Sequence, residues 1–442
     1  MPLWQHQKKA VEILNSNIPA FMLAWEAGAG KTRPAIMAAK TPALYICPAV
    51  LRNQVRDTAA ALHFLPDEIQ VVNKLTDRLS KTAKLIICSY EAISSGLIWK
   101  QAFAREWGSL ICDEAHYLKN TASKRTRAIY GARVDSKASL FRKARQVVLL
   151  TGTPMMNAPD ELWSHLSRLQ YDKLWAKNIK SKEEFVAKFC ITNDTPYGAV
   201  VTGVRNVVEL QNMLEGFMWR VTKEQVLELP LLTIDTIFIP PQKIDLSDVP
   251  PEALAELDDI LTNNDFTDID KIQRLAPHLA TLRRRIGLAK AAHFAKLVIE
   301  ELNSGVEKIA IFAVHTDVIN ELSTAFSKAK ITNVIFDGKR TQAQKDQAKY
   351  DFINSPQVRV FIGQITAAGT GLDGLQAVCS RGYILEAAWT PAVNEQAIAR
   401  LDRGGQTKKV RSSYVVLENS IDTRIVLSLR RKEKLINKVM KK

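Results

Sequence analysis

Two short motifs, one near the start of the chain and one further on, bring together residue types that suit phosphate chemistry. In the first, Lys31 and Thr32 directly follow the small residues Gly28, Ala29 and Gly30. Glycines let backbone N–H groups close around phosphate oxygens, a lysine supplies positive charge to the β and γ phosphates, and a threonine hydroxyl can bind Mg²⁺. The motif therefore predicts a loop that binds a nucleoside triphosphate.

The second motif, Asp113-Glu114-Ala115-His116, supplies groups that can act on the bound triphosphate. An aspartate here can hold the metal ion, which neutralises charge that builds up on the transferred phosphoryl group. The adjacent glutamate can orient or deprotonate the attacking water. Across both motifs, the candidate catalytic residues are Lys31, Asp113 and Glu114, and the candidate metal ligands are Thr32 and Asp113.

The surroundings of both motifs favour this interpretation. Each follows an apolar run typical of a buried strand, residues 20–24 for the loop and residues 109–112 for Asp113, and a helical pattern follows the loop. Strand, loop and helix is the required order, and ligands of open α/β sheets bind at the carboxyl ends of strands. The loop departs from the full pattern because Trp25 stands where the first glycine belongs. Either motif alone could be a surface turn, but the two together in this order favour a nucleotide site.

Apolar, strand-like runs alternate with helical stretches, which predicts parallel sheets covered by helices. The first series comprises residues 20–24, 43–47, 84–88, 109–112 and 147–150, and the second comprises 308–314, 332–336, 358–362, 381–385 and 411–417. We therefore predict an α/β fold of two lobes. The predicted parts are an N-terminal lobe (1–158), helical insertions with an inter-lobe linker (159–285), and a C-terminal lobe that closes with a basic helix (286–442).

Composition narrows the class of protein. The chain has 442 residues, 46% of them hydrophobic, and a formal net charge of +15. Such a charge points to a polyanionic partner, with nucleic acid as the first candidate. Five cysteines without Cys-x-x-Cys spacing predict buried, reduced thiols and no zinc site. Without a signal sequence or an apolar run of about eighteen residues, we expect no membrane association. The expected location is the cytoplasm, in a bacterium or the host of a virus, or the nucleus in a eukaryote.

Further motifs resemble, in order and spacing, those of the Swi/Snf-like ATPases of helicase superfamily 2. In the first half they are Leu3 with His6-Gln7, residues 23–32, 47–49, 89–91 and 113–116, Thr151-Gly152-Thr153-Pro154 with Asn157 and 161–163, and residues 217–230. In the second half they are residues 337–338, 367–372, 389–391, and Gln396-Ala397 with Arg400, Arg403 and 405–406. The resemblance covers nearly the whole chain and implies a minimal motor core of two tandem RecA-like lobes with helical insertions between them.

The same resemblance implies roles for individual residues. For ATP binding it adds to the phosphate loop Gln7, which reads adenine, Gly371, and the arginine fingers Arg400 and Arg403, which also count as catalytic. For coupling of hydrolysis to DNA contact it implies His116, Thr151, Gly152, Thr153 and Gln396. For DNA contact it implies Pro48, Ser89, Tyr90, Thr366 and Trp389. Since Arg400 and Arg403 are three residues apart, we predict that they share one face of a helix.

Together, the residues and the resemblance predict a DNA-dependent ATPase that uses ATP and Mg²⁺ to move along double-stranded or forked DNA. Such a motor would remodel DNA or protein–DNA complexes. Residues 282–291 are similar to the branch that includes annealing helicases at replication forks, which suggests fork remodelling or strand annealing. Three alternatives stay open: a strand-separating DNA or RNA helicase, a nucleotide-gated DNA clamp that does not hydrolyse ATP, and a basic DNA-binding scaffold. Protein partners cannot be inferred from these residues.

Overall fold

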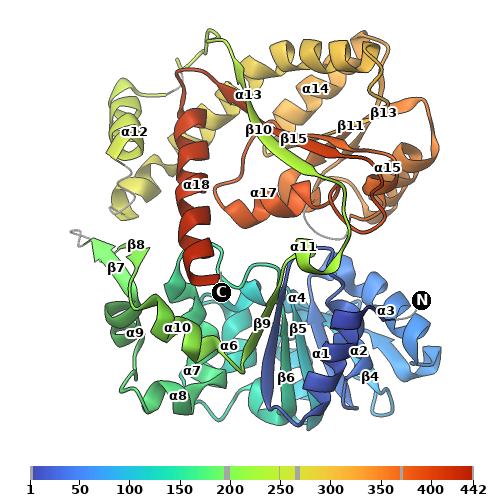
Figure 1. Cartoon of the computed structure of the whole chain (residues 1–442), viewed down its shortest axis with the longest axis vertical. Coiled ribbons are helices and arrows are strands. Elements are labelled where there is room, and N and C mark those ends of the chain that lie inside the picture. The colour runs from blue at the N-terminus through green and yellow to red at the C-terminus, as the bar shows by residue number, and fades with distance from the viewer. Residues whose placement is uncertain (1–2, 194–199, 248, 264–268, 369–371, 441–442) are drawn as a thin grey trace. The chain divides into compact units, whose positions relative to one another are not determined.

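The chain forms two compact units, each built around its own sheet (Figure 1). The computed structural model describes residues 3–193, 200–247, 249–263, 269–368 and 372–440. The first unit comprises residues 1–191, 201–227 and 435–442, and the second comprises residues 192–200 and 228–434.

The first unit contains a seven-stranded sheet in the order β3-β4-β2-β5-β6-β1-β9. Its strands are β1 (Ala20–Trp25), β2 (Ala43–Cys47), β3 (Ile69–Val71), β4 (Leu85–Ser89), β5 (Trp107–Asp113), β6 (Ala144–Leu150) and β9 (Met218–Val221). All neighbouring pairs are parallel, so every strand ends at the same edge of the sheet. Strands β1, β2, β4 and β5 are buried at every residue, as expected where helices cover both faces of a parallel sheet.

The second unit contains a six-stranded sheet in the order β10-β15-β14-β11-β13-β12, again with parallel pairs. Its strands are β10 (Leu232–Ile239), β11 (Ile309–Ala313), β12 (Thr332–Phe336), β13 (Val358–Gln364), β14 (Arg381–Ile384) and β15 (Val410–Leu417). A separate small sheet pairs β7 (Cys190–Asn193) with β8 (Val200–Val204).

Helices surround both sheets. Those of the first unit are α1 (Gln5–Asn15), α2 (Thr32–Met37), α3 (Arg52–Leu62), α4 (Tyr90–Ile93), α5 (Gly96–Phe103), α6 (Lys124–Tyr130), α7 (Trp163–Leu169), α8 (Tyr171–Trp175), α9 (Lys182–Phe189), α10 (Val207–Leu214) and α11 (Lys223–Val226). Those of the second unit are α12 (Pro251–Asn263), α13 (Ile269–Asn303), α14 (Thr316–Lys328), α15 (Gln342–Asn354), α16 (Ile365–Ala368) and α17 (Pro391–Ile398), followed by α18 (Ile421–Met440), whose last residues belong to the first unit.

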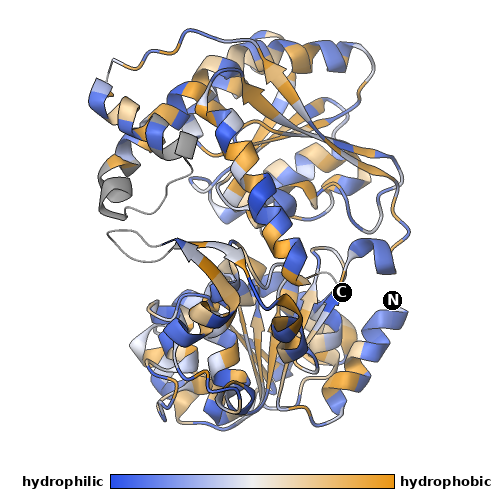
Figure 2. Cartoon of the chain, turned by 60° about the vertical axis from the view of Figure 1, so that its left-hand side comes forward, coloured by the Kyte–Doolittle hydropathy of each residue, from blue (hydrophilic) through white to orange (hydrophobic). Residues whose placement is uncertain are grey.

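The alternating direction of side chains along each central strand divides each core into two layers. In β1, Ala20, Met22 and Ala24 enter one apolar cluster, while Phe21, Leu23 and Trp25 enter the other. The same division separates Ile309, Ile311 and Ala313 of β11 from Ala310 and Phe312. Figure 2 shows the result, with hydrophobic strands inside each unit and hydrophilic residues on the outward faces of the helices.

All ten strand-like runs of the sequence are confirmed as strands of the two sheets, with ends that differ by at most three residues. The α/β prediction of parallel sheets covered by helices is therefore confirmed. The sequence analysis missed β3, β7, β8, β9 and β10, and of these β9 and β10 lie within the segment 159–285 yet complete the two large sheets. The boundary at 285/286 falls inside α13. The predicted three-part division stays a prediction.

The five cysteines are free and buried, as predicted. Among the described residues, no helix is both long enough and apolar enough to cross a membrane.

The core of the first unit contains a histidine that makes its stability depend on pH. His165 is 1% exposed, and its Nδ1 lies 2.9 Å from the Tyr130 hydroxyl. Burial, with a smaller contribution from His116, lowers the pKa of His165 from 6.5 to about 4. In the unfolded chain this histidine is protonated below about pH 6.5, whereas in the folded chain it stays neutral down to about pH 4. The free energy of unfolding therefore falls as the pH drops from 6.5 to 4.

We expect this histidine alone to lower the free energy of unfolding by about 2 kcal/mol between pH 7 and pH 5. Urea unfolding at both pH values measures the difference. His165→Asn, which cannot take up the proton, should show a weaker pH dependence, whereas His63→Asn at an exposed histidine should behave like the original chain. Equal pH dependence in all three proteins would contradict the assignment.

Candidate nucleotide-binding site

The predicted phosphate loop connects the end of β1 to the start of α2, as its motif requires. Gly28 and Gly30 have φ angles of 92° and 77°, a left-handed conformation that glycine adopts at little cost. The Lys31 ammonium donates to the carbonyl oxygens of Trp25 at 2.8 Å and Glu26 at 3.3 Å. The lysine charge is thus held inside the loop.

Helix α1 fastens this loop through two consecutive side chains. His6 Nε2 lies 2.9 Å from the Ala29 carbonyl oxygen, and Gln7 Nε2 donates to the Gly30 carbonyl oxygen at 3.0 Å. Gln7 Oε1 accepts from the backbone N–H of Trp4 at 2.9 Å, and the Gln7 residue is only 1% exposed. The Gln7 amide is therefore engaged with backbone groups, and its role toward adenine stays a prediction.

Trp25, the departure from the usual loop pattern, has a packing role. It is fully buried, and its ring lies against His6 and Trp219, with centroid distances of 4.8 and 5.3 Å. The indole therefore links β1 to α1 and to β9. The motif alone gave no signal for this, because the partners lie far apart in the sequence.

Asp113 ends β5 with its carboxylate 5% exposed and fixed from two sides. Its Oδ1 accepts from the backbone N–H of Glu114 at 2.9 Å, and its Oδ2 accepts from the Tyr45 hydroxyl at 2.8 Å. Burial and the adjacent Glu114 carboxylate raise the pKa of Asp113 to about 6. Burial, and then the Asp113 charge, raise the pKa of Tyr45 well above its ordinary value, so this phenol stays a hydrogen-bond donor.

The residues at this point fit a magnesium ion. The Thr32 side chain lies near the Tyr45 phenol that binds Asp113, so the hydroxyl of Thr32 and the carboxylate of Asp113 lie on the same side of the site. Mg²⁺ prefers oxygen ligands and is usually held by one or two carboxylates together with substrate phosphates and waters. Within the described ranges, no cluster of three or more His, Cys, Asp or Glu could hold a metal by itself. Tyr45 was missed by the sequence analysis because it lies in an apolar strand run.

Glu114 connects the end of β5 to the end of β6. Its backbone is left-handed, with φ 51° and ψ 52°, a strained conformation that is typical of functional sites. His116 Nδ1 lies 3.3 Å from Glu114 Oε2 and 3.3 Å from Thr151 Oγ1. Thr151 Oγ1 in turn accepts from the Thr153 backbone N–H at 3.0 Å. Three of the predicted coupling residues therefore form one chain of contacts that begins at the candidate catalytic carboxylate.

The turn after β6 also approaches the phosphate loop. A Cβ atom added to Gly152 would lie 3.4 Å from Ala27 N and from Trp25 O. The structure therefore places a fourth predicted coupling residue against the loop. Gln396, the fifth, is half-buried in α17 of the second unit.

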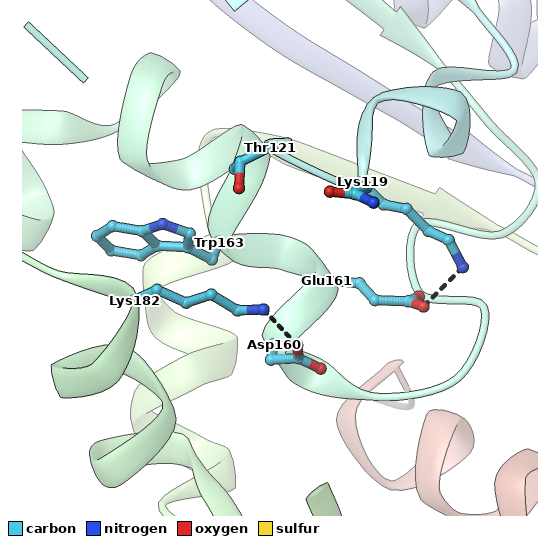
Figure 3. Close-up of a pocket in the computed structure, with 7 residues that line it drawn as sticks. Lys119, Thr121, Asp160, Glu161, Trp163 and Lys182 are labelled. Atoms are coloured by element: carbon cyan, nitrogen blue, oxygen red, sulfur yellow. Dashed lines mark hydrogen bonds and ion pairs between the residues drawn. The ribbon is translucent and has the colours of Figure 1, made fainter. Parts of the chain in front are cut away.

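A polar cavity of about 260 Å³ is lined by residues of the segment after His116, of the segment after Thr153 and of α9 (Figure 3). Lys119 Nζ donates to Glu161 Oε1 at 2.7 Å, and Lys182 Nζ lies 3.0 Å from Asp160 Oδ2. Burial acts to raise the pKa of Glu161, but Lys119 and the other hydrogen bonds to this carboxylate lower it overall. The ion pair of Lys119 with Glu161 joins the two segments, and because both lysines bind carboxylates the four charges that line the cavity balance.

The two predicted arginine fingers lie close together in the second unit, but not as the sequence analysis expected. Helix α17 ends at Ile398, so Arg400 and Arg403 lie in the following turns, and the prediction that they share a helix face is wrong. Arg400 Nη1 donates to the Leu372 carbonyl oxygen at 2.7 Å, and Arg403 Nη1 lies 3.2 Å from Asp373 Oδ1. Gly371 lies outside the described residues.

The predicted DNA-contact residues differ in exposure. Pro48, Ser89 and Tyr90 are buried, while Thr366 is exposed in α16 and Trp389 is half-buried. The Ser89 hydroxyl caps α4 by accepting from the Ala92 N–H. The Tyr90 hydroxyl donates to the Asp113 carbonyl oxygen at 2.8 Å. Arg283 stacks over the Trp389 ring at 4.9 Å from its centroid. A role in DNA contact stays a prediction for all five.

The close contact between α1 and the phosphate loop predicts that the cost of replacing a glycine by alanine differs among three positions of the first unit. A Cβ atom on Gly30 would collide with Gln7 Nε2, and the positive φ adds strain of about 1–2 kcal/mol. Gly216 also has a positive φ, of 74°, but a Cβ atom there meets nothing within 4 Å. Gly96 has neither a clash nor a positive φ.

We expect Gly30→Ala to lower the free energy of unfolding more than Gly216→Ala does, and Gly96→Ala to leave it unchanged or slightly raise it. Urea unfolding of the three variants gives the comparison. If Gly30→Ala cost no more than Gly216→Ala, the close contact between Gly30 and Gln7 would be refuted.

The chain shows similarity to known proteins over nearly all of its length. A protein from Xenopus laevis, the SWI/SNF-related matrix-associated actin-dependent regulator of chromatin subfamily A-like protein 1, is 28% identical over 434 residues, which cover 95% of this chain and 42% of the relative. The human DNA annealing helicase and endonuclease ZRANB3 is 27% identical over 440 residues, which cover 93% of this chain and 38% of the relative. The chain thus spans about two fifths of the length of these curated relatives.

Among solved structures, the Sulfolobus solfataricus SWI2/SNF2 ATPase core in complex with dsDNA is 20% identical, with a TM-score of 0.44 and coverage of 100% of this chain and 93% of that chain. A family described as the SNF2-related domain matches residues 6–247, which is more than half of the 442 residues. The matched segment contains the phosphate loop, the Asp113-Glu114-Ala115-His116 motif and the contacts that connect them. The chain therefore belongs to the SNF2-related domain family.

Proposed function

We propose that this protein is a DNA-dependent ATPase that uses ATP hydrolysis to move along duplex DNA and to remodel DNA or protein–DNA complexes. The observation that carries the proposal is the chain of contacts from Glu114 through His116 to Thr151, which adjoins the phosphate loop. It joins the candidate catalytic carboxylate to the turn that the family resemblance assigns to coupling. A site that only bound nucleotide would have no need of such a connection.

The residues of the first unit can divide the chemistry among them. Lys31 supplies positive charge to the phosphates, and Thr32 and Asp113 would hold Mg²⁺, which neutralises negative charge on the phosphoryl group during transfer. Glu114 would orient the attacking water and take its proton. His116 contacts Glu114 at 3.3 Å, so a shift of the turn at Thr151 would be transmitted to the group that positions this water. Arg400 and Arg403 remain our candidates for stabilising the transferred phosphoryl group.

DNA as the second partner is supported by charge and by the relatives. The formal net charge of +15 favours a polyanion, and phosphate contacts made without reading bases are sufficient for movement along a duplex. One relative is named a DNA annealing helicase and others are named regulators of chromatin. We therefore propose double-stranded or forked DNA as the partner, with fork remodelling or strand annealing as the outcome. The second candidate is a strand-separating helicase.

The test is steady-state ATP hydrolysis without nucleic acid and with single-stranded DNA, duplex DNA, forked DNA or RNA, all at one salt concentration. We expect strong stimulation by duplex or forked DNA and displacement of a triplex-forming strand without unwinding. Stimulation by single strands or RNA alone, with unwinding of a tailed duplex, would favour a helicase. Turnover that duplex and forked DNA leave unchanged would refute the proposal.

Replacement of Glu114, the candidate water-orienting residue, distinguishes the proposed ATPase from a DNA clamp that binds ATP without hydrolysing it. We expect Glu114→Gln to lower turnover by about a hundredfold or more while ATP and DNA binding remain largely intact, because Asp113 still holds the metal. The matched control is Glu106→Gln at an exposed glutamate, which should turn over ATP normally. Lost nucleotide binding in Glu114→Gln, or equal turnover in both variants, would contradict the role given to Glu114.

A further inference from the structure

A tyrosine of β2 occupies the point where the two candidate magnesium ligands converge. Tyr45 donates its hydroxyl hydrogen to Asp113 Oδ2 at 2.8 Å, and the Thr32 side chain lies near the same phenol. These ligands come from different elements, because Thr32 begins α2 and Asp113 ends β5. The Tyr45 hydroxyl thus binds one candidate ligand and lies beside the other.

The hydroxyl is the informative part of this side chain. Tyr45 is 0% exposed and its ring belongs to the apolar cluster that includes Ala43 and Cys47 of the same strand. A phenylalanine ring could fill the same apolar space, whereas a hydroxyl in such a core is costly unless it forms hydrogen bonds. Here the hydroxyl binds Asp113, one of the two residues expected to hold Mg²⁺.

The hydrogen bonds to Asp113 leave its carboxylate little freedom to rotate. The Glu114 N–H binds Oδ1 while the Tyr45 hydroxyl binds Oδ2. Each carboxylate oxygen can accept more than one hydrogen bond or ligand, so both oxygens retain capacity for a metal or its waters. Residues that orient metal ligands in this way commonly affect metal affinity strongly.

We propose that Tyr45 is a positioning residue that holds the Asp113 carboxylate in place for the magnesium ion that accompanies ATP. The inference rests on the proposed function, since it assumes a magnesium–nucleotide site at these residues. The effect of Tyr45 is on geometry, because the hydroxyl adds no charge. Its removal should therefore weaken the metal-dependent part of nucleotide binding and spare the part that the loop and Lys31 supply.

The test compares Tyr45→Phe with the unmodified protein and with the matched control Tyr130→Phe. Tyr130 is also fully buried, and its hydroxyl lies 2.9 Å from His165 Nδ1. Equilibrium binding of a fluorescent ATP analogue is measured in EDTA and during titration with Mg²⁺. Direct binding of Mn²⁺ with nucleotide, followed by electron paramagnetic resonance, gives a second readout.

For Tyr45→Phe we expect unchanged nucleotide affinity in EDTA and a metal concentration at half-saturation that rises about three- to tenfold, the effect of one hydrogen bond. Tyr130→Phe should match the unmodified protein in both. Binding in EDTA also reports that the site is folded. If the Mg²⁺ concentration at half-saturation were unchanged in Tyr45→Phe, the proposal would be overturned. A lower concentration would also overturn it, because it would mean that the phenol competes with the metal ion. If the unmodified protein itself bound nucleotide without any dependence on Mg²⁺, the proposed function would fail as well.

Discussion

The buried carboxylate of Asp113 is the constraint on which much of the first unit depends. A carboxylate that is 5% exposed is stable in its charged form only where hydrogen bonds and opposite charges surround it. The hydroxyl of Tyr45 and the backbone N–H of Glu114 provide the hydrogen bonds, and the Lys31 charge favours the ionised form. The Tyr90 hydroxyl binds the carbonyl oxygen of the same residue. Strands β2 and β5, helix α4 and the phosphate loop are therefore all tied to one position.

That arrangement also explains why a strained residue follows directly. Glu114 takes a left-handed backbone conformation, which costs on the order of 1–3 kcal/mol for a residue other than glycine. The strain turns the chain so that the Glu114 side chain meets His116 and, through it, the turn after β6. The ion pair of Lys119 with Glu161 holds the next parts of the same two segments together. A movement of either segment is thus transmitted through contacts of a few ångströms.

The second unit presents a comparable pattern around its own strand ends. Glu386 lies two residues after the end of β14 and is 4% exposed. Its Oε2 accepts from the backbone N–H groups of Val314 and His315, each at 2.9 Å, and its Oε1 lies 2.7 Å from His315 Nδ1. The loop that carries Trp389 is thereby fixed to the end of β11. In both units, a buried carboxylate at the carboxyl end of a parallel strand fixes the adjacent loop.

The sequence by itself determined the ten strands that have a continuous apolar run, and the two motifs. Runs such as residues 43–47 are apolar throughout because both faces of these parallel strands are buried, so their signal is local and strong. The order of motifs was sufficient to place the phosphate loop after β1 and Asp113 at the end of β5. Strands β9 and β10 escaped detection because β9 is only four residues long and β10 is a partly exposed edge strand without a continuous apolar pattern.

Only the tertiary structure decided which groups meet. The contacts of Tyr45 with Asp113, of Gln7 with Gly30 and of Trp25 with Trp219 join residues that are far apart in the sequence, and no local pattern specifies such pairs. The end of α17 before Arg400 likewise appears only in the tertiary structure, where the chain leaves the helix after Ile398 and buries Leu401 and Asp402 in the following turn. Local residue patterns specify the elements, whereas the satisfaction of buried polar groups by distant partners specifies the site.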